Sequence, residues 1–452
     1  MMLFRIGRLN AGLAIACICH LAGVTQSQGE TLQSVVQRAV MSNPEVAALQ
    51  ANRLATDEEL AAAKGLGRPK VDVEAGTGYL TRDETGSAGS GYAADTWHTE
   101  VSANVSVPVF DGWKTHYEVT RQGSRVESAR HRVADTANSI ALQTVQAYLE
   151  VQRSGAVADV AERNVAALRE ILERVRSRAS AGRSASAEVT QARARVDAAE
   201  AMLVEARSRY YDAMALYVSV VGEAPSDLAR VGLPMAMMPA TVDEAVERAR
   251  IEAPSLAAVH HDVLAAEAAV GTAWSEFYPR LDLEFSGLHR NDSDVNFGDN
   301  DEFQAMVVLR KNLYNGGIDT ARVREAEHRV DQAEAIAASA ARVIEKEVRL
   351  AWLAMHSAAD RSGYLERQLE SNRALVSAYD SQFEIGQRTL LDILDLRNEI
   401  FTAEADLVTE RFANVYNAYR LLGTMGVLCA ELGIALPEEA LIEPDLERFP
   451  LP

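Results

Sequence analysis

The stretch Pro-Lys-Val-Asp-Val-Glu at residues 69–74 returns in the second half of the chain as Pro-Arg-Leu-Asp-Leu-Glu at residues 279–284. Matching positions continue on both sides of it: residues 31–39 with 241–249, 109–112 with 313–316, Tyr148 with Trp352, Gly182 with Gly386, and Gly222 with Gly426. The offset between matching residues is 210 as far as residues 69–74 and 204 from residue 109 onwards, and matches at two constant offsets indicate an internal repeat. We therefore infer that residues 30–222 and 241–426 are two copies of one duplicated segment with a common fold.

Each half is predicted to contain two β-strands. Apolar Val71 and Val73 flank polar Asp72, and this alternation is typical of a strand with one apolar and one polar face. Residues 82–97 and 290–302 are rich in Gly, Ser, Asp and Asn and are predicted to be solvated hairpin loops; the second lacks the spacing of a calcium-binding loop. The pattern gives four strands, at about 70–81, 98–110, 280–289 and 303–314.

Long helices are predicted for most of the rest. Residues 114–178 carry apolar and small residues at three- and four-residue spacing without a proline, which corresponds to a helix of roughly 100 Å. A globular domain cannot surround such a helix, so we expect coiled-coil-like packing against neighbouring helices. A helix of about 30 residues, interrupted near Pro44 or Pro254, precedes the strands in each half. The predicted fold class is therefore mainly α with a small β part.

The strands favour an assembly of three chains. Beyond the N-terminus no apolar run is long enough to cross a bilayer as a helix, so insertion into a membrane requires a closed barrel. Four strands cannot close one, because the smallest membrane barrels have about eight; three copies would supply twelve strands and twelve long helices. Acidic strand residues are then expected to face a wet lumen: Asp72, Glu74, Asp282 and Glu284.

The N-terminal residues 1–29 have the features of an export signal, because a positively charged start precedes a short apolar stretch and small residues. Acylation at Cys17 is the alternative, although the apolar stretch before it is short for a lipoprotein. Cys17 and Cys19 lie in this segment, so the mature chain would keep only Cys429 and no intramolecular disulfide. Two further segments are predicted: a Pro-containing linker at 223–240 and an acidic, Pro-containing tail at 427–452.

Several function classes are excluded by composition and motifs. The formal net charge of −20 argues against a nucleic-acid partner, which requires clustered Lys and Arg. The chain contains no nucleophile elbow, phosphate loop or paired metal motif. The adjacent His260 and His261 point to different faces of a predicted helix, so we do not expect them to share a metal. We predict neither an enzyme nor a cofactor or metal site.

The duplication, the turns at 108–112 and 312–316, and the segment Phe-Glu-Ile-Gly-Gln-Arg-Thr-Leu-Leu-Asp-Ile-Leu-Asp at 383–395 resemble the TolC family of outer-membrane exit ducts. The resemblance covers about residues 31–426. It implies a homotrimer with a twelve-stranded barrel in the outer membrane of a Gram-negative cell and a twelve-helix periplasmic tunnel closed at its inner tip. It also implies that a periplasmic adaptor (membrane fusion) protein and an inner-membrane transporter dock on that tip, and that the linker and tail wrap the tunnel.

The segment 383–395 is predicted to form the tip turn. Thr389 lies three residues before Asp392, as in a capping box that opens a helix, and Glu384, Arg388 and Asp392 are spaced for a ladder of charges. The family's constricting aspartates match Asp392 and Asp395, and its tethering arginine matches Arg388. In a trimer these aspartates become six carboxylates around one axis, which raise one another's pKa and attract cations.

The first half has an equivalent turn without the full acidic pair. Gly182 and Glu188 occupy the positions of Gly386 and Asp392, but Gln191 replaces the second carboxylate. We therefore expect only the second half to form the gate.

The cargo is less clearly indicated than the channel. The family's secretion branch has an ordinary cleaved signal, and the overall resemblance to members that export agglutination factors and adhesins favours type I protein secretion through an ATP-driven (ABC) transporter. Drug or metal efflux driven by a proton-coupled pump is the alternative. A purely structural periplasmic coiled-coil protein is the alternative of another class.

Overall fold

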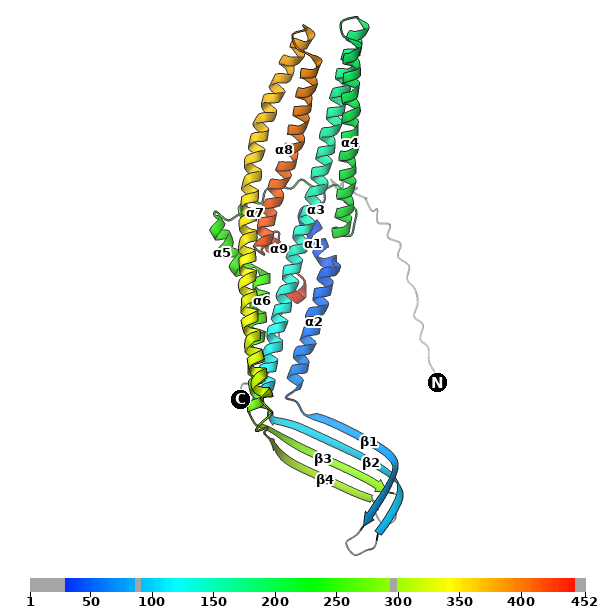
Figure 1. Ribbon diagram of the computed structural model, residues 1–452, viewed down its shortest axis with the longest axis vertical. Helices are drawn as coiled ribbons and strands as arrows, with labels where there is room; N and C mark the ends of the chain where they lie inside the picture. Colours follow the sequence, from blue (N-terminus) through cyan, green and yellow to red (C-terminus); the bar gives the residue numbers. More distant parts are fainter. Residues whose placement is uncertain (1–28, 86–90, 293–298, 444–452) are drawn as a thin grey trace, which may run out of the picture.

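The computed structural model describes residues 29–85, 91–292 and 299–443. It is an elongated molecule with a four-stranded sheet at one end and two helical hairpins that run to the other end (Figure 1). The predicted export signal, with Cys17 and Cys19, lies outside the described residues, and so does the tail from residue 444 onwards.

The two halves contain the same elements in the same order, and this confirms the duplicated fold. The first half comprises α1 (Leu32–Ser42), α2 (Pro44–Gly65), β1 (Lys70–Thr85), β2 (Gly91–Phe110), α3 (Lys114–Ser180) and α4 (Ser186–Val221). The second comprises α5 (Val242–Glu252), α6 (Pro254–Trp274), β3 (Arg280–Asp292), β4 (Asp299–Arg310), α7 (Ile318–Glu384) and α8 (Leu390–Thr424). Between the halves lies the 3₁₀ turn Met235–Met237, and the tail contains α9 (Leu428–Glu431) and the 3₁₀ turn Glu438–Ala440.

The long helices α3 and α7 each contain 67 residues. In Figure 1, α2 and α4 lie end to end along α3, and α6 and α8 lie along α7. The helix expected to be interrupted near Pro44 is in fact two helices, because Asn43 caps α2 by accepting the Glu45 N–H (2.8 Å) and Pro44 takes the first helical position. Among the described helices, none has both the length and the apolar character needed to cross a bilayer.

The sheet has the strand order β1-β2-β3-β4, with every neighbouring pair antiparallel. β1 and β4 are therefore its two edges. Each hairpin is longer than predicted, because backbone pairing continues beyond the alternating residues. It reaches Thr85↔Gly91 in the first hairpin and Asn291↔Asp299 in the second. The described residues of the loops predicted at 82–97 and 290–302 belong to strands, and residues 86–90 and 293–298 lie outside the described residues.

The predicted end of the fourth strand at residue 314 is wrong. β4 ends at Arg310, which pairs with Arg280, the first residue of β3. The residue before Arg280 is Pro279, which has no backbone N–H and cannot donate a further hydrogen bond to β4. The chain after Arg310 turns towards α7 instead.

The pairing register separates the two faces of the sheet. Directly paired residues share a face, so Asp72↔Asn104 and Asn104↔Ser286 place all four predicted acidic residues on one side. The rows Val71↔Val105 and Val105↔Phe285 lie on the opposite, apolar side. Such a sheet suits lipid on one face and water on the other.

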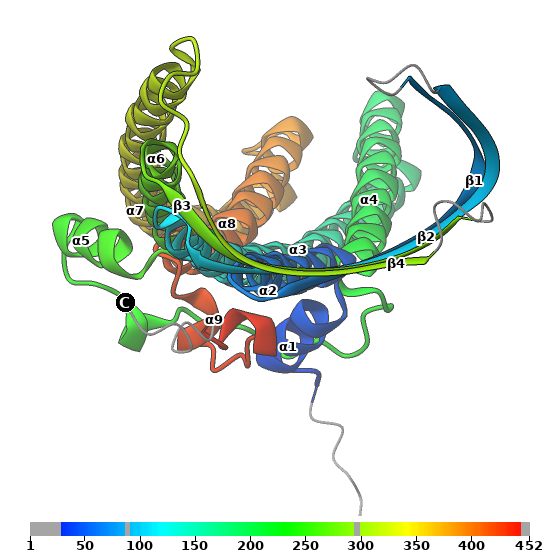
Figure 2. The ribbon, with the colours of Figure 1, turned by 90° about the horizontal axis from the view of Figure 1, so that it is seen from below.

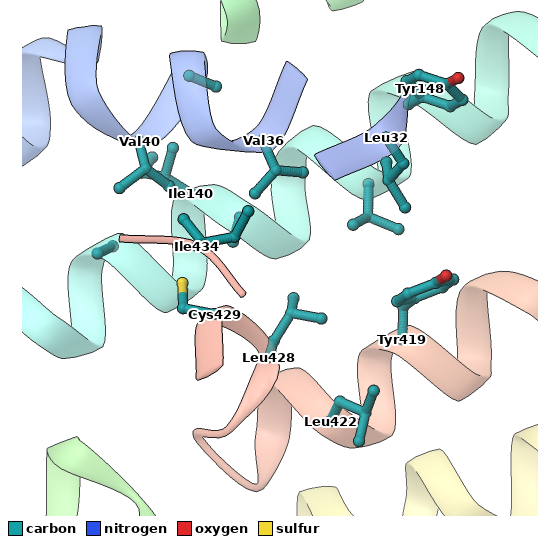
Figure 3. Packing of buried hydrophobic residues seen from close by; sticks show 14 of the residues in the cluster. Leu32, Val36, Val40, Ile140, Tyr148, Tyr419, Leu422, Leu428, Cys429 and Ile434 are labelled. Atoms are coloured by element: carbon teal, nitrogen blue, oxygen red, sulfur yellow. The ribbon is translucent and has the colours of Figure 1, made fainter. Parts of the chain in front are cut away.

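The main hydrophobic core lies midway along the molecule, where both halves and the tail meet. Figure 3 shows Val36 and Val40 of α1 packed with Ile140 of α3, and Leu422 and Leu428 from the C-terminal segments. The tail is fixed there by Asn138 of α3, which donates to the Gly423 carbonyl (2.7 Å) and accepts from the Leu428 N–H (3.1 Å). Cys429 belongs to this core, and burial raises the pKa of its thiol to about 12.

Candidate functional site at the helical tip

Two similar turns close the hairpins at the end of the molecule opposite the sheet (Figure 1). Gly182 (φ +72°) and Gly386 (φ +76°) both adopt the left-handed conformation that favours glycine. The N–H of Arg183 donates to the Arg178 carbonyl (2.9 Å), and the N–H of Gln387 donates to the Gln382 carbonyl (2.8 Å). This bond across the end of a helix is that of a Schellman motif, so the two turns share one local geometry.

The second turn leads into a complete capping box, as the sequence predicted. Asp392 Oδ2 accepts the Thr389 N–H (2.9 Å) and hydroxyl (2.8 Å), while the Thr389 hydroxyl accepts the Asp392 N–H (3.3 Å). These hydrogen bonds, together with Arg388, lower the pKa of the Asp392 carboxyl in the single chain. The direction is opposite to the one expected from six crowded carboxylates, because here the carboxylate is held by donors.

At the tip turn between α3 and α4, helix α4 begins after Ala185, which makes no side-chain capping bond. Glu188 lies in the first turn of α4, where a negative charge interacts favourably with the helix N-terminus. The two turns therefore differ in their side chains although their backbones agree.

Arg388 is held by its own hairpin. Its guanidinium lies over the Tyr379 ring (4.3 Å to the centroid), its Nε donates to Gln382 Oε1 (3.0 Å), and its Nη1 is 4.0 Å from Asp392 Oδ1. The rest of the predicted charge ladder is wrong: Glu384 pairs with Arg178 of α3 (3.1 Å). α7 ends at Glu384 and α8 begins at Leu390, so the spacing of four does not bring Glu384 and Arg388 together on one helix.

Ion pairs between the two hairpins were not predicted from the sequence. Arg195 Nη2 of α4 lies 3.0 Å from Asp395 Oδ1 of α8, and Arg174 Nη1 of α3 lies 3.5 Å from Asp380 Oδ1 of α7. Arg178 also stacks on the Phe383 ring (4.5 Å). No local pattern marks these arginines, because their partners lie about two hundred residues away in the chain. The duplication is the signal that could have paired the two tips.

A buried apolar cluster lies beside these ion pairs. Side chains from all four long helices contribute, and Leu390 and Leu394 of α8 are almost completely buried. The other members are Val165, Leu168, Ile171, Leu172, Val175, Ala192, Val196, Ala199, Phe383 and Ile393. In this conformation the two hairpins are therefore packed together near the tip.

At the sheet, the acidic residues predicted for the lumen have different environments. Asp282 is fully buried, with Arg280 Nε at 2.8 Å and Arg310 Nη1 at 3.0 Å, and Glu284 also pairs with Arg310 (2.7 Å). Arg280 and Arg310, which pair directly with each other at one end of the β3–β4 ladder, thus compensate two of the four acids. Asp72 and Glu74 on β1 are exposed.

The lateral edges of the protomer carry exposed apolar stripes. Seen along the long axis, the helices form an open arc with α4 on one side and α7 on the other (Figure 2). Exposed apolar residues recur every seven positions on both helices, which places them on one face of each helix. They are Val204, Tyr211 and Val218 on α4, and Ile336, Val343 and Leu350 on α7. Single chains rarely expose such stripes unless a partner covers them.

Together, the two-faced sheet with open edges, the long helices and the exposed apolar stripes on α4 and α7 define a subunit of an oligomeric membrane channel. The family described as outer membrane efflux protein matches residues 35–222 and 245–426, so the chain belongs to this family, which includes the TolC proteins.

Known relatives and structures agree with this assignment. The outer membrane efflux protein BepC of Brucella suis is 26% identical over 423 residues, which cover 91% of this chain and 89% of BepC. The alkaline protease secretion protein AprF of Pseudomonas aeruginosa is 27% identical over 255 residues, 55% of this chain and 53% of AprF. A crystal structure of CusC has a TM-score of 0.79 at 16% identity and covers 87% of this chain and 91% of CusC.

The chain is accordingly an outer-membrane channel of a Gram-negative bacterium that extends into the periplasm. Channels of the TolC family are passive conduits and not enzymes. They are trimers that work with periplasmic adaptor proteins and inner-membrane pumps.

Proposed function

We propose that three copies of this chain form an exit duct whose gate is the helical tip. The observation that carries the proposal is the ion pair between Arg195 and Asp395, which joins the α3–α4 hairpin to the α7–α8 hairpin at the end of the molecule (3.0 Å). Separation of the hairpins would break it and widen the tip. In this proposal Asp392 and Asp395 constrict the passage, and Arg388 ties the tip turn to α7 through Tyr379 and Gln382.

The assembly that we propose uses the lateral edges of the protomer. The apolar stripe on α4 of one copy packs against the stripe on α7 of the next, and the β4 edge pairs with the neighbouring β1 edge. Both contacts use surfaces that a single chain leaves exposed. The face with Asp72, Glu74, Asp282 and Glu284 then lines the lumen, and the opposite apolar face contacts lipid.

Single-channel recordings in planar lipid bilayers test the gate. Replacing both Asp392 and Asp395 by Ala should raise the conductance and weaken the preference for cations, because it removes the acidic ring and the link to Arg195. Glu188→Ala is the matched control, since it removes the equivalent carboxylate from the first turn. Conductance that stays at the wild-type level in the double variant, or that rises equally in the control, would contradict the assignment.

For the cargo we propose type I protein secretion, with an adaptor and an ATP-driven transporter docked at the tip. The similarity to AprF, named for protease secretion, supports it over half of the chain. Efflux by a proton-driven pump is the second candidate, and the longer similarity to the efflux protein BepC supports it.

Deleting the gene distinguishes the two cargo proposals. Loss of a large secreted protein from the medium, with unchanged sensitivity to drugs and metals, is expected for secretion. Increased sensitivity with an unchanged set of secreted proteins would favour efflux instead. Complementation with the wild-type gene and with the Glu188→Ala variant provides the control for expression.

A further inference from the structure

A cluster of potential metal ligands lies between α3 and α6, far along α3 from the tip. Glu127 and His131 are one helical turn apart on α3, and His261 of α6 faces them. The rings of His131 and His261 are stacked, with centroids 5.4 Å apart and planes 17° from parallel. One ligand atom from each of the three residues lies within 4.8 Å of the other two.

We propose that Glu127, His131 and His261 bind a divalent transition-metal ion, with Zn²⁺ the best match. Two imidazoles and a carboxylate form a known zinc donor set, and a water completes the tetrahedron. Ligand atoms about 2.0–2.1 Å from a tetrahedral zinc are about 3.4 Å from one another, so atoms that now lie within 4.8 Å need to approach by at most about 1.4 Å.

Arg130 now contacts two of the three proposed ligands. It donates to Glu127 Oε2 (2.7 Å), and its Nη2 lies 3.1 Å from His131 Nε2. Arginine can only donate, so His131 Nε2 accepts this bond with the lone pair that a metal would use. A bound Zn²⁺ would replace one cation by another, which keeps the charge of Glu127 compensated.

The surroundings favour neutral imidazoles. Burial lowers the pKa of His131 to about 4 and also lowers that of His261, so both rings are in the ligand form at neutral pH. The neighbouring Asp262 is paired with Arg132 (2.7 Å), and it therefore does not compete for the metal.

Metal binding at this place would connect the two halves of the chain. α3 belongs to the first half and α6 to the second, and they pack together just above the sheet. Arg130, when displaced, would also lose its contact to the Ala440 carbonyl in the tail (3.4 Å). The adjacent pair His260–His261 alone did not predict the site, because Glu127 and His131 come from the other half.

Calorimetric titration of the detergent-solubilised, full-length protein with ZnCl₂ tests the proposal. One Zn²⁺ should bind per chain, and His131→Ala or His261→Ala should weaken binding at least about tenfold. The matched control is His260→Ala, which removes the neighbouring imidazole and should leave the affinity unchanged. Co²⁺ added in place of Zn²⁺ should give the visible absorption of a tetrahedral site with nitrogen and oxygen ligands.

The conservative variants His131→Gln and His261→Gln keep the size of the side chains and guard against misfolding. Trimer migration on gels shows whether each variant assembles. The proposal is overturned if assembled wild-type protein binds no Zn²⁺, or if binding is equally strong in the His131 and His261 variants. Neither result would affect the gate proposal, because the gate pair Arg195–Asp395 lies at the tip on α4 and α8, whereas the proposed metal site lies between α3 and α6.

Discussion

The ion pair between Arg195 and Asp395 gives the sharpest prediction about the gate. Its atoms are 3.0 Å apart, and the side chains are 42% and 54% exposed, so solvent screens the attraction. An exposed pair of this kind contributes about 0.2–1 kcal/mol. If the three copies of this ion pair in a trimer break together on opening, they stabilise the closed state by a total of about 0.6–3 kcal/mol. Removing them would shift the equilibrium towards the open state about 3- to 150-fold.

Arg195→Ala should therefore raise the time-averaged conductance in planar bilayers without preventing assembly. The buried cluster around Leu390 and Leu394 keeps the closed state populated, because truncating one buried leucine costs about 2–5 kcal/mol, more than a single exposed ion pair contributes. High salt should diminish the difference between wild type and variant, since ions screen exposed pairs.

Exchanging the charges of Arg195 and Asp395 tests whether the attraction between these two side chains keeps the tip closed. Arg195→Asp should open the tip further, because it places two carboxylates side by side, and adding Asp395→Arg should restore closure. If the exchanged protein conducts as strongly as Arg195→Asp alone, then Asp395 does not act through Arg195, and the reasoning from this contact is wrong.

Three further predictions concern the tip and the core. Hydrogen bonding lowers the pKa of Asp392, so the contribution of this carboxylate to closure is complete above the ordinary aspartate range and is lost as the pH falls through the lowered pKa. Acid should therefore raise the conductance of the wild-type channel, and Asp392→Asn should abolish that rise. Cys429, with a pKa near 12, should resist maleimide at pH 7.5 in the native trimer and react fully once the protein is unfolded; reaction in the native state would exclude the buried position. Asn138→Ala should cost about 1–3 kcal/mol, measured as easier thermal dissociation, because the Leu428 N–H loses its acceptor; Gln143→Ala, exposed on the same helix, should have no effect.

Much of the tip could be predicted because its structure is local. The capping box joins Thr389 and Asp392, three residues apart, and the left-handed turn requires a glycine at position 386. Such features depend on a few neighbouring residues and are visible in any sequence that contains them. The ladder through Glu384 was predicted wrongly because a continuous helix was assumed where the chain turns.

The periodic features of this protein can be read from the amino-acid sequence: the duplication, the two-faced strands and the long helices. Periodicity states which residues share a face, and a repeat states that two segments fold alike. The positions of the strand ends do not follow from this periodicity, because backbone pairing extends beyond the alternating side chains.

Which of these faces meet becomes visible in the folded chain. It pairs Arg195 with Asp395, covers Asp282 with two arginines, and brings His131 of the first half against His261 of the second. Each contact depends on how two elements distant in sequence are rotated and offset relative to each other. Local patterns do not encode that relation, since it is set by the packing of the whole chain.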